Sequence, residues 1–438
     1  MKAFELLEKK VFIDLFAGCG GLSLGLMRGG WKGLFAIEQS PDAFKTLKYN
    51  LIDEDNDSEL SLRYDWPDWL EKAPLEISAF IKMYEKEIRS LKGEITLVAG
   101  GPPCQGFSFA GKRTGDDPRN ELFEHHLEIV DMVKPVLVLM ENVQGISVGF
   151  KNNPKGTGSK KEAKKSYAAK IKKKLYDHGY EVFQEVIWAK DYGVPQLRPR
   201  FFTLGISRDY FNQELGFSGL EGKLKEIREN FLVCKYRGLG WNSPVTLEEA
   251  ISDLLVSGKE VVPCTDEESP RGFQEPLYQE PKTTYQEIMR SGLKHKQPNS
   301  MRLPRHKQET LEKFEKILAK APKGKALPSE LRKELGINKK VIVPLAPDKP
   351  SKTLTTLPDD YIHYSEPRIL TPREYARVQS FPDWFSFKGK FTTGGRFRKK
   401  ECPRYTQIGN AVPPMLAEAI GIALLDLLRS IKQGGQLQ

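Results

Sequence analysis

Short apolar runs alternate with amphipathic stretches through the first 207 residues. The runs are rich in β-branched and aromatic residues and are bounded by Gly, Pro or polar residues, which is typical of buried strands. They cover residues 11–16, 33–37, 95–100, 135–140, 181–188 and 201–206. Apolar residues at helical spacing lie between them and predict helices at 22–27, 41–50, 76–92 and 117–133. This alternation predicts an α/β fold with a mostly parallel, doubly wound sheet.

The pattern changes near residue 208. Periodicity weakens, Pro and Gly become more frequent and charges of both signs mix, so we expect residues 208–403 to form a smaller, irregular domain. It contains a predicted helix near 309–320 and another over 371–383. The second helix has Thr371 at the N-cap, Pro at the first helical position and Glu374 three residues after the cap. A last helix follows in 404–438, with Leu416, Ile420 and Leu427 on one face.

Length, charge and cysteine usage narrow the class of protein. A chain of 438 residues should divide into two or three domains. Its formal charge of +10 favours an anionic partner such as nucleic acid, although charge also serves solubility. Five Cys without a C-x-x-C, and six His without ligand spacing, predict no disulfide framework and no metal site. The charged start and the lack of a long apolar run predict a cytoplasmic protein outside membranes.

The first candidate for chemistry is the sequence GPPCQGFS at residues 101–108, directly after the strand 95–100. Two prolines stiffen the turn and hold a thiol just beyond the carboxyl end of a strand, where α/β sheets bind their ligands. We take Cys104 as a candidate nucleophile. The alternative is a small buried cysteine in a tight turn.

A glycine-rich turn at residues 17–21 follows the first strand. Gly18 and Gly20 fit a nucleotide-binding turn, although position 23 is Ser where G-x-G-x-x-G has Gly. Glu38 ends the second strand about 20 residues later, where an acid binds ribose hydroxyls. The alternatives are an ordinary βα turn and a solvated Glu. Asp65 and Trp66 are expected to end a short third strand near an adenine, or else to lie on a surface loop.

Four further groups carry charge. Glu141 ends the strand 135–140, one βα unit after Cys104, and is expected near it on the same edge of the sheet; the alternative is a helix start, with Asn142 as the N-cap. Arg198 and Arg200 alternate on an extended segment, so both should face one side. The ten Lys of 151–174 suit either a solvated face or phosphate contacts. A basic cluster comprises Arg302, Arg305, His306 and Lys307.

Taken together and in order, these motifs resemble the 5-methylcytosine DNA methyltransferase family. The resemblance rests on DLFAGCGG at 14–21, GPPCQGFS at 101–108, ENV at 141–143, QLRPR at 196–200, the helix 371–383 and QIGNAV at 407–412. It implies a Rossmann-like S-adenosylmethionine-dependent methyltransferase domain, 1–207, to which 404–438 returns. The region 208–403 would then be the target-recognition domain.

The resemblance also implies roles for the catalytic residues. Cys104 would attack carbon 6 of a cytosine swung out of the duplex, so that carbon 5 becomes nucleophilic. A protonated Glu141 would hydrogen-bond ring nitrogen 3, which requires a pKa raised by burial. Arg198 and Arg200 would hold the carbonyl oxygen at position 2 and a nearby phosphate or acid. The Pro103 carbonyl would accept from the exocyclic amine.

The binding residues follow from the same motifs. Phe16, Asp65 and Trp66 would contact the adenine, Gly18 and Gly20 the methionine end, and Glu38 the ribose. The whole predicted donor pocket comprises Phe16, Gly18, Cys19, Gly20, Gly21, Glu38, Gln39, Asp65, Trp66, Gly101, Pro102, Asn120, Leu122, Asn410, Ala411 and Val412. The predicted DNA contacts are Gln105, Ser108, Arg302 and Arg305.

The expected function is therefore methyl transfer from S-adenosylmethionine to carbon 5 of cytosine in duplex DNA, leaving S-adenosylhomocysteine. We expect a monomer that belongs to a restriction–modification system, with a cognate restriction endonuclease, or that acts as an orphan enzyme. Three alternatives are a tRNA cytosine-5 methyltransferase, a non-catalytic nucleic-acid-binding relative and an amino-group methyltransferase. The last normally has Asn or Asp before Pro-Pro-aromatic, and this chain has Pro-Pro-Cys instead.

Overall fold

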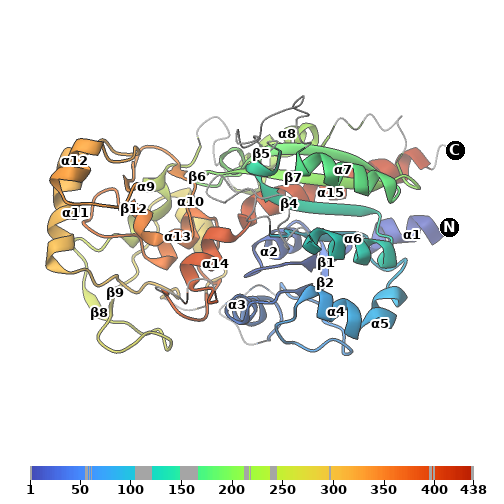
Figure 1. The fold of residues 1–438 in the computed structure, drawn as a ribbon, viewed down its shortest axis with the longest axis horizontal. Helices are drawn as coiled ribbons and strands as arrows, with labels where there is room; N and C mark the ends of the chain where they lie inside the picture. The colour runs from blue at the N-terminus through green and yellow to red at the C-terminus, as the bar shows by residue number, and fades with distance from the viewer. Residues whose placement is uncertain are drawn as a thin grey trace, which may run out of the picture.

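A computed structural model describes residues 2–54, 58, 60, 62–103, 121–147, 166–211, 217, 219–236, 244–294, 297–393, 397 and 400–435. Two lobes lie side by side, and both ends of the chain lie at the far side of the sheet-containing lobe (Figure 1). The predicted positions Cys104, Gln105, Ser108 and Asn120 fall outside the described residues, as does most of the Lys-rich segment.

One lobe is built on a six-stranded sheet in the order β2-β1-β3-β4-β7-β5. The first four strands are parallel, and β7 runs antiparallel between β4 and β5. This confirms the α/β fold with a mostly parallel sheet. The strands are β1 (Val11–Leu15), β2 (Lys32–Ile37), β3 (Leu97–Gly100), β4 (Leu137–Val143), β5 (Tyr180–Trp188) and β7 (Pro199–Ser207).

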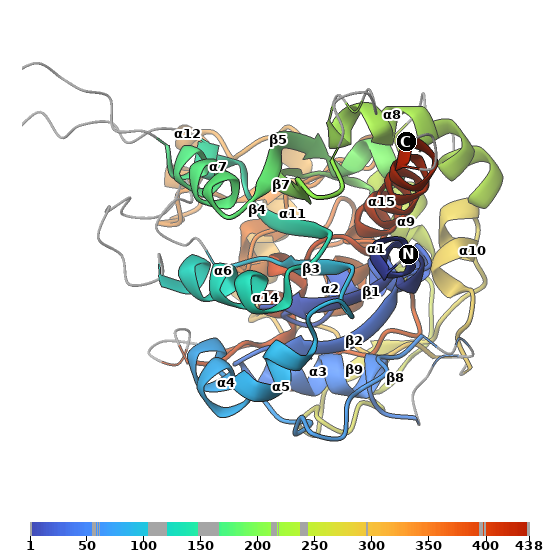
Figure 2. The ribbon, with the colours of Figure 1, turned by 90° about the vertical axis from the view of Figure 1, so that its right-hand side faces the viewer.

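Helices cover both faces of this sheet, as the apolar runs on β1, β3 and β4 require. One face packs against α4, α6 and α7, and the other against α2, α3, α8 and α15. Figure 2 shows the first group on one side of the strands and α15 on the other. The helices of this lobe are α1 (Lys2–Lys9), α2 (Gly21–Arg28), α3 (Pro41–Leu51), α4 (Ile77–Met83), α5 (Glu85–Ser90), α6 (Glu121–Val133), α7 (Tyr167–Asp177), α8 (Leu220–Glu229) and α15 (Pro414–Gly435).

The C-terminal helix α15 lies directly on α2. A Cβ at Gly25 would stand only 2.3 Å from the Cβ of Ala417, so the two helices touch through glycine. Arg28 adds a buried ion pair to Glu418 at 3.0 Å. The helical stretch Arg404–Gln433 is long and apolar enough to cross a membrane, but most of its apolar part is buried inside the protein.

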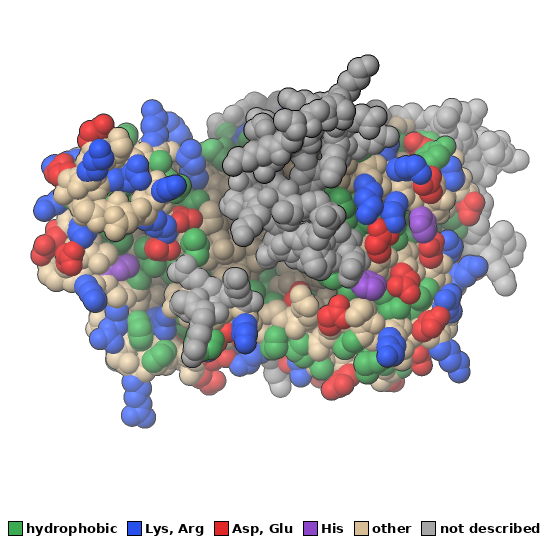
Figure 3. Space-filling model, in the orientation of Figure 1, with side chains coloured by type: hydrophobic (Ala, Val, Ile, Leu, Met, Phe, Trp, Pro, Cys, Tyr) green, Lys and Arg blue, Asp and Glu red, His purple; other side chains and the backbone are tan. Residues whose placement is uncertain are grey.

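The second lobe is irregular, as its sequence indicates. It comprises α9 (Leu247–Ile251), β8 (Val261–Pro263), β9 (Gln274–Pro276), α10 (Thr284–Arg290), α11 (Gln308–Lys320), α12 (Ser329–Glu334), β10 (Val343–Pro344), β11 (Ser351–Lys352), β12 (Tyr361–Ile362) and α13 (Pro372–Val378). Helix α14 (Arg404–Asn410), in the segment 404–438 that is expected to return to the first domain, packs against α13 and joins the two lobes. A separate small core lies between α11, α12 and Ile362. Acidic and basic side chains are interspersed where α11 and α12 form the surface in Figure 3, so the charge of +10 is not gathered there.

Several element boundaries differ from the sequence-based expectation. The helix predicted over 76–92 is divided at Tyr84 into α4 and α5. The helix predicted over 371–383 ends at Val378, although its capping box between Thr371 and Glu374 forms. Residues 62–66 form no strand. Helix α8 lies before the irregular lobe and packs on β5 and α15, so this part of 208–403 sits against the sheet.

Helix α3 fastens the second lobe to the first. Asn50 Nδ2 donates to the Ser386 carbonyl at 2.7 Å, and Thr46 Oγ1 donates to Gln407 Oε1 at 2.7 Å. Both side chains are fully buried. Helix α3 begins just after Glu38, the acid at the end of β2. These two hydrogen bonds therefore join the edge of the sheet where the methyl donor is expected to the second lobe.

A buried polar chain ties β1 to α2. Ser23 Oγ donates to Asp14 Oδ2 at 2.5 Å, and the Tyr64 hydroxyl donates to Ser23 Oγ at 2.5 Å. The other oxygen of Asp14 has no hydrogen-bond partner in the described part of the chain. Burial therefore raises the pKa of Asp14 to about 7, against an ordinary value of 3.8.

The shifted pKa of Asp14 predicts how stability depends on pH. Between pH ~4 and ~7 the folded protein holds a proton that the unfolded chain releases, so Asp14 lowers stability progressively as pH rises through this window. The slope is up to about 1.4 kcal/mol per pH unit. The Asp14→Asn variant lacks this contribution. Its stability advantage over the parent, measured by urea unfolding, should grow across the window and level off above pH ~7; a constant difference would contradict the prediction.

Candidate active site

The carboxyl ends of β1, β3 and β4 meet at one edge of the sheet. Leu15 pairs with Gly100, and Gly100 pairs with Met140, so the segments that follow these strands emerge together. A Cβ placed on Gly101 would lie 3.3 Å from Glu141 Oε2. The structure therefore brings Glu141 against the start of the turn that carries the predicted nucleophile. Pro102 is buried there, and Gly101 and Pro103 are half-buried.

Glu141 and Arg200 form an ion pair at this edge. The Nε atom of Arg200 lies 2.6 Å from Oε1 of Glu141, and both side chains are largely buried. Their strands fix the pair, because β4 and β7 place Val143 opposite Arg200. Burial raises the pKa of the Glu141 carboxyl, although the charges of Arg200 and Arg198 oppose that shift. A carboxyl in such a setting can carry a proton that it would lose in water.

Arg198 points into the protein and makes different contacts from Arg200. Its side chain is 1% exposed. It donates to the carbonyls of Gly409 at 2.6 Å, Ala411 at 3.2 Å and Leu354 at 3.2 Å. These contacts occupy the end of the guanidinium. In this structure Arg198 thus joins three chain segments behind the site, and its expected contact with the base stays a prediction.

The glycine-rich turn after β1 has the shape of a ligand cradle. Phe16 and Gly18 have φ of 64° and 58°, and strain of this kind in a residue with a side chain gathers at functional sites. A Cβ on Gly18 would meet nothing within 4 Å, so its Cα faces open space. A Cβ on Gly21 would lie 2.4 Å from the Val412 carbonyl oxygen. The turn and the segment Ala411–Val412 are thus neighbours, as the predicted donor pocket requires.

Glu38 lies beside this turn. Its Oε2 accepts from the Gly18 N–H at 2.8 Å and its Oε1 accepts from the Ser40 N–H at 2.7 Å. Each carboxylate oxygen retains a lone pair for a ribose hydroxyl. Burial raises the pKa of Glu38. The arrangement fits a nucleoside-containing donor.

The other predicted pocket residues differ in exposure. Cys19 is buried and its thiol donates to the Gln407 carbonyl, 3.6 Å away, so it belongs to the core beneath the turn. Gln39 and Asn410 are exposed, and Leu122 on α6 is half-buried.

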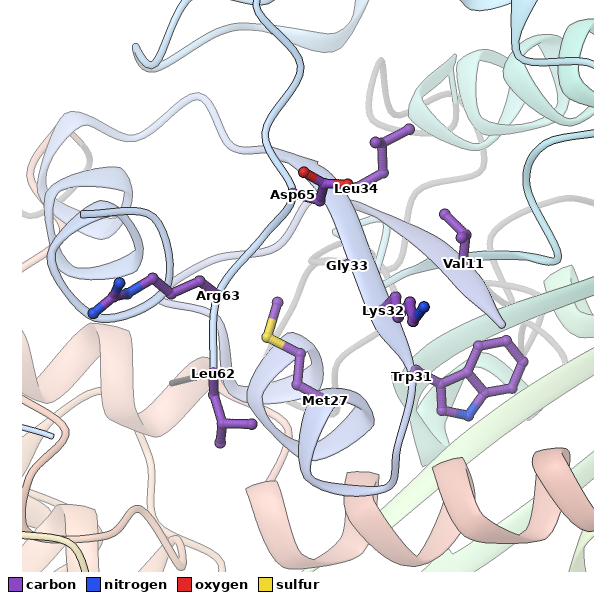
Figure 4. A pocket seen from close by; sticks show the side chains of 9 residues that line it. All are labelled: Val11, Met27, Trp31, Lys32, Gly33, Leu34, Leu62, Arg63 and Asp65. Carbon is purple, nitrogen blue, oxygen red and sulfur yellow. The ribbon is translucent and has the colours of Figure 1, made fainter. Parts of the chain in front are cut away.

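Asp65 lies away from the donor turn. Its N–H donates to the Gly33 carbonyl at 2.8 Å, near the beginning of β2, whereas Glu38 follows the end of that strand. Asp65 also lines a cavity of about 280 Å³ with Val11 and Lys32, the first residues of β1 and β2 (Figure 4). Asp65 is exposed on a loop, which is the alternative that the sequence left open. The connection 51–94 is long, so the sequence match alone does not determine where along the strands Asp65 lies.

Trp66 points back toward α3. Its indole N–H donates to the Leu70 carbonyl at 2.8 Å, and its ring lies edge-on to Phe44, 6.3 Å between centroids. Tyr64 lies beside Trp66 and has a role that the sequence motifs do not indicate. Tyr64 reaches Ser23 and packs on Phe12, and only its aromatic character could have indicated a buried role.

Asn142 is a second residue whose role the sequence did not reveal. Its sequence position also suits a helix N-cap, but Asn142 lies within β4. Its buried Nδ2 donates to the Pro102 carbonyl at 3.4 Å. It therefore supports the turn that Glu141 flanks.

The two predicted DNA-contacting arginines lie in unlike surroundings. The Arg302 guanidinium is stacked between two rings, with centroids at 4.1 Å for Phe273 and 3.7 Å for Phe391. Arg305 is exposed and lies 5.3 Å from the Phe273 centroid. Stacking on the two rings holds the Arg302 side chain in the fold. Arg305, in contrast, faces solvent. Among the described residues, no group of three or more His, Cys, Asp or Glu is arranged for a metal ion.

A mostly parallel sheet with a glycine cradle at β1, an acid at the end of β2 and an acid–arginine pair at β4 defines a Rossmann-like, S-adenosylmethionine-dependent methyltransferase. Comparison with known proteins gives the family. The family profile described as C-5 cytosine-specific DNA methylase matches residues 11–426. The chain belongs to this family and is a DNA cytosine methyltransferase.

Its relatives agree along nearly the whole chain. The type II methyltransferase M.DdeI of Desulfomicrobium norvegicum is 33% identical over 419 residues, covering 93% of this chain and 86% of the relative. The type II methyltransferase M1.HphI of Haemophilus parahaemolyticus is 30% identical over 423 residues, covering 95% and 87%. A crystal structure of a prophage-encoded DNA modification methyltransferase from Escherichia coli aligns with a TM-score of 0.58 and 25% identity, covering 96% and 99%.

The carbonyl contacts of Arg198 predict a large effect on stability. Replacing Arg198 by Met removes the side-chain donor of the buried Leu354 and Gly409 carbonyls, whereas the Ala411 carbonyl still accepts from Gln379 Nε2 at 3.0 Å. The loss should lower the free energy of unfolding by about 3 kcal/mol. Arg208→Met is the matched control, because Arg208 makes one exposed hydrogen bond to the Tyr176 carbonyl at 3.1 Å. Its loss should stay within about 1 kcal/mol. Urea unfolding measures both, and equal stability of the two variants would refute the structural role of Arg198.

Proposed function

We propose that this DNA cytosine methyltransferase works through a covalent bond between the Cys104 sulfur and carbon 6 of a flipped-out cytosine. The observation that carries the proposal is the buried pair of Glu141 and Arg200 beside the turn at Gly101. Carbon 5 of cytosine is a weak nucleophile toward a methyl group. Addition of a thiolate to carbon 6 turns carbon 5 into an enamine-like centre, which divides one difficult step into easier ones.

Glu141 supplies the proton that this addition needs. As sulfur attacks carbon 6, electron density moves toward ring nitrogen 3, and a protonated carboxyl there neutralises it. The raised pKa of Glu141, caused by burial, supports this role. S-adenosylmethionine supplies the electrophilic methyl group. Loss of the carbon 5 proton to a base then lets the sulfur leave and restores the aromatic ring.

Arg200 orients the acid and binds the base. Its Nε holds Glu141, and the remaining guanidinium nitrogens can reach the cytosine oxygen at position 2. We assign Arg198 as a positioning residue, because carbonyls occupy the end of its side chain. The Pro103 carbonyl would accept from the exocyclic amine and so favour cytosine over thymine.

The donor pocket is proposed from the cradle already described. Gly18 and Gly20 would face the methionine end, Glu38 the ribose, and Phe16 the adenine. Ala411 and Val412 would close it from the C-terminal segment. Asn120 remains a prediction outside the described residues, and S-adenosylhomocysteine is the product that this transfer leaves.

The relatives suggest a cellular setting. Both curated relatives named above are type II methyltransferases, and we infer that this chain likewise methylates a specific duplex sequence, in a restriction–modification system or as an orphan enzyme. A cognate endonuclease, a monomeric state and a cytoplasmic location complete the proposal. The second lobe would read the DNA, with Arg305 among its phosphate contacts.

Trapping with 5-fluorocytosine tests the covalent step. Fluorine at carbon 5 cannot leave as a proton, so enzyme, methyl donor and a random-sequence duplex containing 5-fluorocytosine should give a complex that survives denaturing electrophoresis. Cys104→Ser should form none, and Cys264→Ser should form as much as the parent. A complex with 5-fluorocytosine tRNA alone would replace duplex DNA by tRNA as the substrate, and no complex with either would overturn the mechanism.

The unlike surroundings of Arg305 and Arg302 predict unlike effects on DNA binding. Arg305→Ala should weaken binding at all sequences and reduce the slope of log K against log salt by about 0.9, the value for one phosphate contact. Lys313→Ala is the control, since Lys313 pairs with Glu309 at 2.6 Å on α11. Arg302→Ala should instead lower the stability of the fold. Fluorescence anisotropy over a salt series decides, and an unchanged slope in Arg305→Ala would rule out the contact.

A further inference from the structure

A histidine lies beneath the catalytic turn without an assigned role. His126 is on the inner face of α6, between Phe123 and Val130, and is 0% exposed. Its ring approaches the end of β3. A Cβ on Gly100 would lie 3.3 Å from His126 Nε2 and 2.4 Å from the Leu15 carbonyl oxygen. His126 therefore stands beside the last residue of the strand that leads into the turn 101–103.

Neither ring nitrogen of His126 has a hydrogen-bond partner among the residues that the structure describes. Burial lowers the pKa of the imidazole to about 3, so the ring is neutral at any working pH. A buried polar group without a partner costs about 1–3 kcal/mol. Leu would fill a similar volume without that cost, so packing alone does not account for a histidine here. Buried groups of this kind point to a bound water or a role in function.

The backbone beside His126 is held by a long hydrogen bond. The Gly101 N–H reaches the Leu15 carbonyl only at 3.3 Å, which is long for such a bond. On the other side, Gly101 faces Glu141 Oε2. The first residue of the turn is thus flanked by the proposed acid and by an imidazole with two unused nitrogens.

We propose that His126 is a positioning residue of the catalytic turn: through one buried water it hydrogen-bonds the peptide groups of Leu15 and Gly101 in the substrate-bound enzyme. The inference rests on the proposed function, because it concerns the placement of the Cys104 thiol. A water of this kind makes about three hydrogen bonds to buried polar groups, and one ring nitrogen, one carbonyl and one N–H supply them. Fixing the turn in this way keeps sulfur aligned with carbon 6, where a displacement of about 1 Å can cost about a hundredfold in rate.

The test compares His126→Leu with His126→Gln. Without ligands, the Leu variant should unfold at the same or higher urea concentration than the parent, because it removes an unpartnered group. Its rate of adduct formation on 5-fluorocytosine DNA should fall at least about tenfold, while the KM for S-adenosylmethionine stays within about twofold. His126→Gln keeps a donor and an acceptor and should recover part of the rate.

Each other outcome decides against the proposal. A stable His126→Leu enzyme with the parent rate would show that the ring only packs. A His126→Leu protein that unfolds more readily or does not fold would show that the imidazole already stabilises the free enzyme. If His126→Leu and His126→Gln lose the same fraction of the adduct-forming rate, the effect comes from the shape of the side chain and not from its hydrogen bonds. Failure of the proposed function is separate, since the parent enzyme itself would then form no adduct.

Discussion

The hydrogen bonds of the buried Arg198 guanidinium determine how the sheet, the second lobe and the C-terminal segment are placed relative to one another. No carboxylate of the described residues hydrogen-bonds the guanidinium, and carbonyls from residues 354, 409 and 411 hold it instead. Desolvating a cation is costly, and several aligned carbonyl dipoles offset that cost only when all are in place. One side chain thereby requires the sheet, the second lobe and the segment before α15 to dock in a single arrangement.

The positions of Glu141 and Arg200 depend on that arrangement. Arg200 lies two residues after Arg198 on the same extended segment, and it meets Glu141 across β4 and β7. Gln196, on the other side of Arg198, donates to Gln379 Oε1 at 2.5 Å. The acid is therefore oriented by a strand whose own position is set by the lobe that would read DNA. Docking of the lobes and orientation of the acid are consequences of one buried network.

Sequence patterns predicted what is local and failed on what is distant. The strands followed from apolar runs, and the capping box of α13 formed from Thr371 and Glu374 as predicted. The meeting of Glu141 with the turn at Gly101 also followed, since parallel strands end at one edge. The partners of Arg198 are 156 to 213 residues away, beyond any local signal. Asp65 matches the motif in sequence order, but it lies beside the beginning of β2 and not beside its end. The long connection before Asp65 leaves its position along the strand undetermined by the sequence.

The polar residues at the ends of β1 and β3 share a physical logic. Asp14 faces α2 and His126 lies on α6, so they occupy opposite faces of the same two strands, and each has atoms without a hydrogen-bond partner. A core selected for stability alone would carry apolar side chains at both positions, on β1 and on α6. Both positions adjoin the turns where a donor and a base would arrive. Polar groups at such turns lower stability and are kept where ligands need them, a balance that proteins strike at their functional sites.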